Sequence, residues 1–340
     1  MLRSNLVQPE KVILEEVKKP KPKKNEVLIA TKTCGICGSD VHAYYGKHPF
    51  IHCPIVQGHE FTGAVAELGP GVKGFKIGQA VTVVPLIICG KCYNCKRGDY
   101  NRCATLKFIG CQTNGAMGEY VSVPASMVVP LPKAIDFDTG ALIEPLAVGI
   151  HAVRRSNLKK GSTVLVLGAG PIGLVTMEAA KAFGAKKVIV SDKIPFRLNM
   201  AKQLGADGII NVGKETLAAG VKRHFGQDGA DIIFECVGAA PTIQQAIEVA
   251  RKGSQIVVVG VFGMEVPVKI GFIQDHELEV RGTAGYKKDD FEEAIRLIQK
   301  KKVKVKPLIT DIFPLKDIAR AYKKIEQNRD QSIKVLIQVN

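Results

Sequence analysis

The sequence predicts an α/β protein that combines a β-rich domain with a doubly wound, parallel-sheet domain. At 340 residues the chain is long for a single hydrophobic core. Residues 1–147 are rich in Gly, Pro and short alternating apolar runs, which is typical of strands and turns, and they hold most of the His and Cys. From 148 to 283, strand-like runs alternate with helical stretches, which indicates βαβ units and a parallel sheet.

The expected elements follow from these patterns in chain order. Strands of the first region are expected at Val27–Ala30, Thr62–Glu67, Ala80–Pro85 and Tyr120–Pro124. Strands of the second region, near-continuously apolar as strands buried on both faces should be, are expected at Thr163–Leu167, Lys187–Ser191, Gly208–Asn211, Asp231–Glu235 and Gln255–Gly260. Helices are expected at about 171–183, 195–204, 215–225 and 241–250.

The tail, residues 284–340, predicts two helices and one strand, at Asp289–Lys300, Leu315–Gln327 and Ile333–Gln338. These elements are too few for an independent domain. We therefore expect the tail to pack back onto the first region.

The charge and the cysteine content of the chain indicate which kinds of binding partner and which cell compartment to expect. The net charge is +16, but the basic residues occur in short pairs interleaved with acids, so a solvated, Lys-rich surface is favoured over nucleic acid. The alternative explanation of the positive charge is that part of it serves to bind an anionic substrate or cofactor. The start lacks the apolar core of a signal peptide, and runs such as Ile256–Phe262 are too short for a membrane span. Nine cysteines without a secretory signal favour a reducing, cytoplasmic location.

Four cysteines, Cys89, Cys92, Cys95 and Cys103, have the spacing C-x2-C-x2-C-x7-C. Four thiolates at such separations can surround one Zn²⁺ tetrahedrally, and a shell of four sulfurs leaves no open position. The spacing therefore predicts a structural zinc site. The alternative is a set of buried or disulfide-bonded cysteines.

A glycine-rich turn follows the strand-like run Val164–Leu167. It reads Gly168-Ala169-Gly170-Pro171-Ile172-Gly173 and opens a helix, which is the context of a dinucleotide-binding loop. Gly168 permits the tight turn, Gly170 lets the backbone approach a pyrophosphate, and Gly173 lets helix and sheet pack closely, with Pro171 and Ile172 in the first turn.

The next strand-like run ends at Asp192. A carboxylate there can accept both ribose hydroxyls and repel a 2′-phosphate, which predicts NAD rather than NADP. Lys193 and Arg197 follow, and a cation in this place can accommodate a 2′-phosphate. The predicted preference for NAD over NADP is therefore moderate.

A second metal site is indicated by the segment from Cys34 to His42 together with Gly58-His59-Glu60. Cys, His and a carboxylate can bind zinc and leave one position open for substrate. The pattern alone does not say whether Cys34 or Cys37 is the ligand. Cys34 and Cys37 could also form a redox pair, although no thioredoxin-like βαβ unit frames them. His48, His52 and Cys53, in the intervening loop, are more readily packed or exposed than ligating.

Five motifs in this order carry a resemblance to a known family: GICGSDVH, GHEFTGAV, the four-cysteine segment, GALIEPLAVGIHA and LGAGPIG. The chain resembles the zinc-dependent medium-chain alcohol and polyol dehydrogenases over essentially its whole length. The sorbitol-dehydrogenase-like subgroup, with its bacterial polyol, hexonate and sugar-alcohol-phosphate enzymes, is the most similar. The resemblance implies a GroES-like β-rich catalytic domain, residues 1–147 with 284–340, around a Rossmann domain at 148–283.

The resemblance also implies the ligands of a catalytic zinc. Cys37 and His59 would be the first two ligands, and Glu60 a third ligand or a nearby carboxylate that exchanges onto the metal. Glu144, in Leu142-Ile143-Glu144-Pro145, would replace the cysteine that completes the site in alcohol dehydrogenases, directly or through water. Two zinc ions per chain are implied, one catalytic and one structural.

Three further roles follow from the same resemblance. Asp40 would hold the other nitrogen of His59, and Ser39 and His42 would relay the substrate proton to solvent. Where animal sorbitol dehydrogenases carry Arg before a Tyr, this chain has Gly285 before Tyr286, which puts free sorbitol in doubt.

The expected function is oxidation of a secondary alcohol of a polyol or sugar acid (hexonate) by NAD. L-threonine 3-dehydrogenase and sugar-alcohol-phosphate dehydrogenase are the alternatives within the family, and a non-enzymatic binding protein of the same fold is the alternative outside it. We expect a small-molecule substrate, no nucleic acid or membrane partner, and a homodimer or homotetramer. The apolar run Val266–Ile270 is the candidate edge strand for that assembly.

Overall fold

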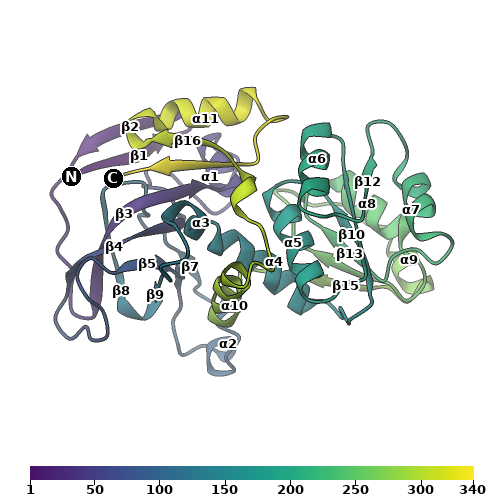
Figure 1. The fold of residues 1–340 in the computed structure, drawn as a ribbon, viewed down its shortest axis with the longest axis horizontal. Coiled ribbons are helices and arrows are strands. Elements are labelled where there is room, and N and C mark those ends of the chain that lie inside the picture. Colours follow the sequence, from purple (N-terminus) through teal and green to yellow (C-terminus); the bar gives the residue numbers. More distant parts are fainter. The chain divides into compact units, whose positions relative to one another are not determined.

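The computed structural model describes all 340 residues, and their contacts divide the chain into two units (Figure 1). The first unit contains Met1–Glu144 and Ile309–Asn340, and the second contains Pro145–Leu308. The first boundary lies close to the expected 147/148. The second lies later than the expected 283/284, because helix α10 (Lys288–Gln299) buries Phe291, Ala294, Ile295 and Leu297 within the second unit.

The first unit is built on a seven-stranded sheet with the order β16-β17-β3-β4-β5-β9, in which β8 also pairs with β3. The strands are β3 (Glu26–Ile36), β4 (Glu60–Leu68), β5 (Ala80–Val83), β8 (Tyr120–Pro124), β9 (Val128–Pro130), β16 (Ile309–Pro314) and β17 (Lys334–Gln338). The C-terminal strand β17 therefore pairs with β3, antiparallel, so that the yellow end of the ribbon lies beside the purple one (Figure 1).

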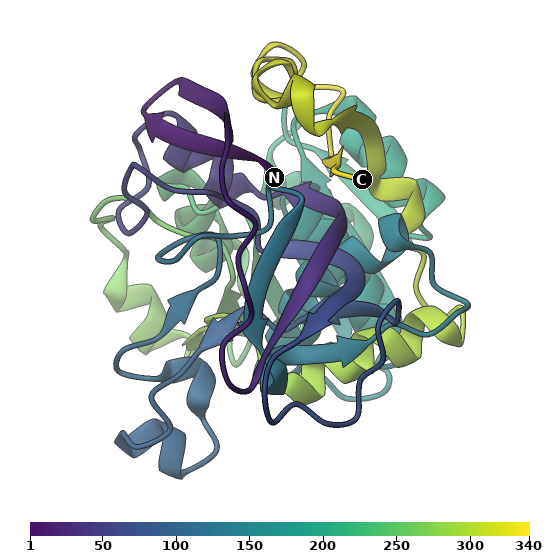
Figure 2. The same cartoon turned by 90° about the vertical axis from the view of Figure 1, so that its left-hand side faces the viewer.

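Smaller elements complete this unit. They are the hairpin strands β1 (Leu2–Gln8) and β2 (Lys11–Glu16), the pair β6 (Leu86–Ile87) and β7 (Lys107–Phe108), the α-helices α1 (Gly38–Tyr44), α2 (Tyr93–Lys96), α3 (Phe137–Ala141) and α11 (Ile318–Gln327), and the 3₁₀ turns Tyr100–Arg102, Ala125–Met127 and Leu315–Asp317. Both chain ends lie near each other in this unit (Figure 2), where Leu2 N–H and the Asn340 side chain each donate to Glu119.

The second unit is a six-stranded, wholly parallel sheet with the order β12-β11-β10-β13-β14-β15. The strands are β10 (Thr163–Leu167), β11 (Lys187–Asp192), β12 (Gly208–Asn211), β13 (Ile232–Glu235), β14 (Gln255–Val258) and β15 (Glu279–Gly282). The order reverses at β10, as in a doubly wound dinucleotide-binding sheet. This confirms the predicted α/β class.

Five helices connect consecutive strands of this sheet: α5 (Pro171–Ala182), α6 (Pro195–Gln203), α7 (Leu217–Phe225), α8 (Ala240–Val249) and α9 (Ile270–Asp275). Helix α4 (Ile143–Arg155), which begins at the unit boundary, precedes β10, and α10 follows β15 and leads to the 3₁₀ turn Lys306–Leu308. None of the helices combines the length and the apolar character that a membrane span requires.

One predicted strand is wrong, and the strands β15 and β16 were not predicted. The run Val266–Ile270 is not a strand, because Pro267 has no N–H for a ladder and the segment leads into α9; the sheet edge is β15 instead. The tail also holds a second strand, β16, which the sequence patterns did not indicate and which pairs in parallel with β17.

Candidate active site and zinc sites

Cys37, His59 and Glu60 converge at one end of the first unit's sheet. One ligand atom from each residue lies within 4.8 Å of the others. The strand register explains this convergence: β3 pairs with β4 so that Gly35 is opposite Glu60, which places Cys37, just beyond β3, beside His59, just before β4. Thiolate, imidazole and carboxylate form a donor set that suits zinc.

The geometry distinguishes the two cysteines of the first motif. Cys37 lies in the cluster with His59 and Glu60 and remains partly exposed. Cys34 is fully buried, donates to the carbonyl of Gly35, and has a pKa raised well above its ordinary value by that burial. Cys34 is therefore a packed thiol.

His59 is 5% exposed, and its Nδ1 faces two side chains. The Sγ of Cys111 lies 3.7 Å away and the Oδ1 of Asp40 lies 3.9 Å away. Burial alone lowers the pKa of His59, but Cys111 and Asp40 outweigh it and raise that pKa. Cys111 was not indicated by any spacing in the sequence, since it follows the four-cysteine segment without a motif of its own.

Asp40 is fully buried at the start of α1. Its Oδ2 accepts the Cys37 N–H at 2.9 Å, whereas its Oδ1 has no hydrogen-bond partner and is directed at His59. Burial raises the pKa of this carboxyl. An orphaned buried oxygen beside a histidine ring is the arrangement expected of a group that orients a metal-binding imidazole.

Glu60 forms a buried ion pair with Lys334 of β17. The Nζ of Lys334 lies 2.8 Å and 2.7 Å from the two carboxylate oxygens. The side chains are 2% and 1% exposed, for Lys334 and Glu60 respectively. Burial by itself lowers the pKa of Lys334, but Glu60, Cys37 and Glu144 outweigh it and raise that pKa. The sequence contains one signal for this pair, a lysine inside an otherwise apolar strand.

Glu144 is 5% exposed and lies in the first turn of α4. It is near enough to Lys334 to raise that lysine's pKa, but its carboxylate is not in the group formed by Cys37, His59 and Glu60. The structure thus brings Glu60, and not Glu144, into direct convergence with the other two donors.

Ser39 and His42 lie one helical turn apart on α1, which starts directly after Cys37. Ser39 is half-buried and His42 is exposed. Partial burial, followed by the charges of Arg329 and Lys47, lowers the pKa of His42. A neutral imidazole at the surface end of this turn can accept a proton and pass it to water.

The four cysteines of the second cluster also converge, on a lobe around α2 that projects from the first unit (Figure 2). All nine cysteines are free, so the disulfide alternative does not apply. Backbone N–H groups of Cys89 and Cys92 point at the sulfurs of Cys103 and Cys89, each at 3.3 Å.

Thiols in this lobe cannot all ionise together without a cation. The N–H of Ala104 and that of Cys95 lower the pKa of Cys92 to about 6, while burial and the neighbouring thiols raise that of Cys95 to about 12. A Zn²⁺ ion supplies the missing positive charge, so these residues fit a structural zinc site.

The glycine loop of the second unit has the geometry that a pyrophosphate needs. Gly168 adopts φ +97°, and a Cβ on Gly173 would lie 1.8 Å from the carbonyl oxygen of Gly168. Gly170 precedes Pro171 at the start of α5, and a Cβ there would meet only Arg197 Nη1, at 3.9 Å. The face of Gly170 is therefore open apart from one cation.

Asp192 ends β11 and secures this loop. Its Oδ2 accepts the Ala169 N–H at 2.7 Å and its Oδ1 accepts the Ile194 N–H at 2.9 Å. The carboxylate thus lies directly beside the glycine loop, with lone pairs left for ribose hydroxyls. Ile172 is half-buried in the first turn of α5.

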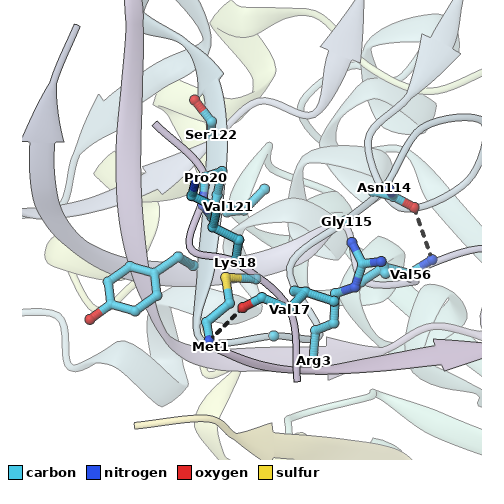
Figure 3. Close-up of a pocket in the computed structure, with 12 residues that line it drawn as sticks. Met1, Arg3, Val17, Lys18, Pro20, Val56, Asn114, Gly115, Val121 and Ser122 are labelled. Atoms are coloured by element: carbon cyan, nitrogen blue, oxygen red, sulfur yellow. Dashed lines mark hydrogen bonds between the residues drawn. The ribbon is translucent and has the colours of Figure 1, made fainter. Parts of the chain in front are cut away.

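A separate pocket of about 230 Å³ lies elsewhere in the first unit, near the N-terminus (Figure 3). It is lined by Met1, Arg3, Val56, Asn114 and neighbouring residues, and the Met1 amine donates to the carbonyl of Val17 at 2.7 Å. None of the residues predicted for metal or cofactor binding lines it.

Comparisons with known proteins place the chain in a family. The alcohol dehydrogenase GroES-like domain matches residues 23–133, and the zinc-binding dehydrogenase domain matches residues 171–300. Sorbitol dehydrogenase of Bacillus subtilis is 34% identical over 333 residues, covering 96% of this chain and 94% of its own. The 2-dehydro-3-deoxy-L-galactonate 5-dehydrogenase of Pseudoalteromonas atlantica is 38% identical over 320 residues, covering 94% and 93%.

Solved structures are similar over the full chain. An Escherichia coli dehydrogenase of unknown specificity has a TM-score of 0.95 at 34% identity, with 100% of this chain and 99% of that one covered. Galactitol-1-phosphate dehydrogenase of E. coli has a TM-score of 0.91 at 31% identity, covering 99% and 100%.

Two similar structures contain a nicotinamide cofactor. A zinc-binding dehydrogenase of Sinorhizobium meliloti is bound to NADP (TM-score 0.92, 30% identity, 99% and 98% covered), and an alcohol dehydrogenase of E. coli CFT073 is bound to NADH (0.93, 31%, 99% and 99%). From its two domains and its relatives, this chain belongs to the zinc-dependent medium-chain alcohol and polyol dehydrogenase family of oxidoreductases.

Proposed function

We propose that this protein oxidises a secondary alcohol of a polyol or a sugar acid to the ketone, with NAD as hydride acceptor. The convergence of Cys37, His59 and Glu60 in a buried cluster carries the proposal. The curated relatives named above act, by their names, on a polyol and on a sugar acid, which favours these two substrate classes.

Each residue has a definite task in this proposal. Cys37 and His59 would hold the catalytic zinc, Glu60 would contribute a carboxylate beside them, and Glu144 would complete the site directly or through water. Zinc, when bound, polarises a hydroxyl group and lowers its pKa, while the nicotinamide accepts the hydride. Asp40 keeps the His59 ring in one orientation, and Ser39 and His42 move the released proton to solvent.

The cofactor is proposed to be NAD because Asp192 lies beside the glycine loop. Its negative charge would repel a 2′-phosphate, whereas Arg197, near Gly170, would attract either the pyrophosphate or that phosphate. All nine cysteines are free, as expected for thiols that hold zinc in a reducing compartment, and this supports a cytoplasmic location.

A sugar-alcohol phosphate is the second candidate substrate. The similarity to galactitol-1-phosphate dehydrogenase and the net charge of +16 favour an anionic substrate of this kind. NAD reduction measured over polyols, hexonates, sugar-alcohol phosphates and L-threonine tests both candidates. The highest kcat/KM should fall on a polyol or hexonate. A clear preference for L-threonine, or no turnover with any of these alcohols, would overturn the proposal.

A further inference from the structure

Lys334 is the only lysine or arginine of the 48 in the chain that is buried. It opens β17, which lies between β16 and β3 in the interior of the first unit's sheet. Moving an ammonium group out of water costs several kcal/mol unless it is paired and hydrogen-bonded. A lysine in this place therefore has to be explained by what it contacts.

The ammonium group makes three contacts, and all of them belong to the proposed zinc site. It donates to both oxygens of Glu60, at 2.8 Å and 2.7 Å, and to the carbonyl of Ile36 at 3.2 Å. Ile36 directly precedes Cys37. One side chain thus ties the Glu60 carboxylate to the end of β3 from which Cys37 projects, and its three protons are all used.

The charges around this lysine are of one sign. The negative charges of Glu60, Cys37 and Glu144 all raise the pKa of Lys334. Asp40 is buried nearby in the same cluster of groups. Lys334 is the one buried lysine or arginine that offsets these negative charges. Its ammonium group lies on Glu60 and holds both oxygens of that carboxylate.

We infer that Lys334 is a positioning residue that keeps Glu60 a weak, restrained zinc ligand beside Cys37 and His59. The inference rests on the proposed assignment of the catalytic zinc to these residues. A carboxylate that accepts two charge-assisted hydrogen bonds has fewer lone pairs and less charge to offer a metal. Lys334 thereby limits how strongly Glu60 neutralises the zinc, whose remaining positive charge is what polarises the alcohol.

Removing the lysine's charge should convert Glu60 into a full ligand. The Lys334→Met variant keeps an unbranched side chain but has no ammonium group to pair with Glu60, so both carboxylate oxygens become available to zinc. We expect zinc release to a chelator, from protein loaded with two equivalents, to be about tenfold slower than in the unaltered protein, the size typical of changes next to a ligand. Lys334→Arg keeps a cation on both oxygens, so release should stay within about threefold of the unaltered rate.

A double-mutant cycle separates this effect from a general change of charge. In a Glu60→Gln background the carboxylate is absent, so Lys334→Met should change the release rate by less than about threefold. Equal slowing in both backgrounds, or faster release from Lys334→Met with Glu60 present, would overturn the inference. Should Lys334→Met fail to fold, slowed release from Lys334→Arg would overturn it as well.

The same measurement separates this inference from the proposed function. If Cys37→Ala still binds two equivalents of zinc, the catalytic site itself is misassigned. If Cys37→Ala loses one equivalent while Lys334→Met releases zinc at the unaltered rate, the zinc site stands and only the role of Lys334 fails.

Discussion

At the scale of single residues, the two donors that most constrain the proposed site are Cys37 and His59. Neither has a neighbour that can replace it, because Cys34 is buried and bonded to a carbonyl, and Cys111 faces the ring of His59. Cys37→Ala and His59→Ala should therefore lose about one equivalent of zinc and lower kcat by at least about 10²–10³-fold.

Metal analysis and steady-state kinetics check this expectation together. Cys34→Ala is the matched control, since it removes a sulfur three residues away that is packed in the core. It should keep both zinc ions and most of the activity. Full zinc content in Cys37→Ala would remove that residue from the site.

The proposed proton relay makes a milder and pH-dependent prediction. Ser39→Ala and His42→Ala should each lower kcat by only about tenfold at neutral pH, because water can substitute in a relay. The pKa of His42 is lowered by partial burial, so His42 remains a neutral acceptor further into acid than an ordinary histidine. The loss should therefore grow as pH falls from alkaline values toward that pKa, where the alcohol gives up its proton less readily.

A pH profile of kcat for both variants decides this point. Losses that are constant across pH would place Ser39 and His42 outside proton transfer. His48 is a suitable control, because it lies in the loop after α1 and outside the zinc cluster; His48→Asn should leave the shape of the profile unchanged.

At the scale of elements, the turn from β10 to α5 is joined to the end of β11 by a hydrogen bond from Ala169 to Asp192. Asp192 both accepts the Ala169 N–H and presents charge to the cofactor, so two variants are needed to separate these tasks. Asp192→Asn retains an acceptor and removes the charge; we expect the NAD-to-NADP ratio of kcat/KM to fall by about tenfold, or ~1.4 kcal/mol. Asp192→Ala should lower the ratio too, and also weaken NAD binding by loosening the loop.

Kinetics with both cofactors measure these ratios directly. Higher kcat/KM with NADP in the unaltered protein would reverse the proposed preference. An unchanged ratio in Asp192→Asn would assign the preference to some other group.

The four-cysteine lobe is a second element with its own prediction. Cys95→Ser removes one sulfur from a cluster that has no other means of balancing its thiolates, so the variant should lose one zinc and melt several degrees lower. The Cys37–His59–Glu60 cluster does not use the lobe, and the remaining zinc and measurable activity should persist. Unchanged melting in a preparation without lobe metal would contradict a structural role.

The sequence predicted five of the six strands of the parallel sheet, and the reasons are physical. The sixth strand, β15, was not predicted, because three of its four residues are exposed. Strands buried on both faces are nearly all apolar, and the glycine loop marks one strand–helix junction, so β10 and β12 have the expected bounds. Val266–Ile270 was apolar as well, but an apolar composition does not reveal that Pro267 prevents pairing. Strand β16 was missed because none of its residues is fully buried, and Ile312 and Pro314 are exposed.

Only those residues of the site that belong to short sequence motifs could be predicted from the sequence. Cys37, His59 and Glu60 belong to two short motifs, whereas their proximity depends on the register of β3 and β4. Cys111 and Lys334 come from loops and strands distant in the chain and reach the cluster only through folding. Cys111 has no motif of its own, and the one signal for Lys334, a lysine in an otherwise apolar strand, does not say which carboxylate it pairs with.

At the scale of the whole molecule, the open edge of the parallel sheet predicts self-association. Strand β15 pairs with β14 on one side and lies at the end of the sheet on the other. Glu279 and Val280 are exposed along it, and Met264 and Ile270, in the preceding segment, are 77% and 68% exposed. An unpaired edge next to exposed apolar side chains is a surface that a second copy of the chain can cover.

The charges of β15 suit a two-fold, antiparallel pairing centred on Val280. In that register Glu279 lies opposite Arg281 of the partner subunit, and opposite charges facing each other across strands stabilise the pair. Val280→Glu would place two carboxylates at the two-fold axis, so a homodimer should become a monomer and a homotetramer should become smaller. Sedimentation velocity at micromolar concentration measures this.

Ile77→Glu, at an apolar residue that is 64% exposed in the first unit, is the control and should leave the assembly unchanged. A monomeric unaltered protein, or a Val280→Glu variant with the original mass, would show that β15 is not the interface.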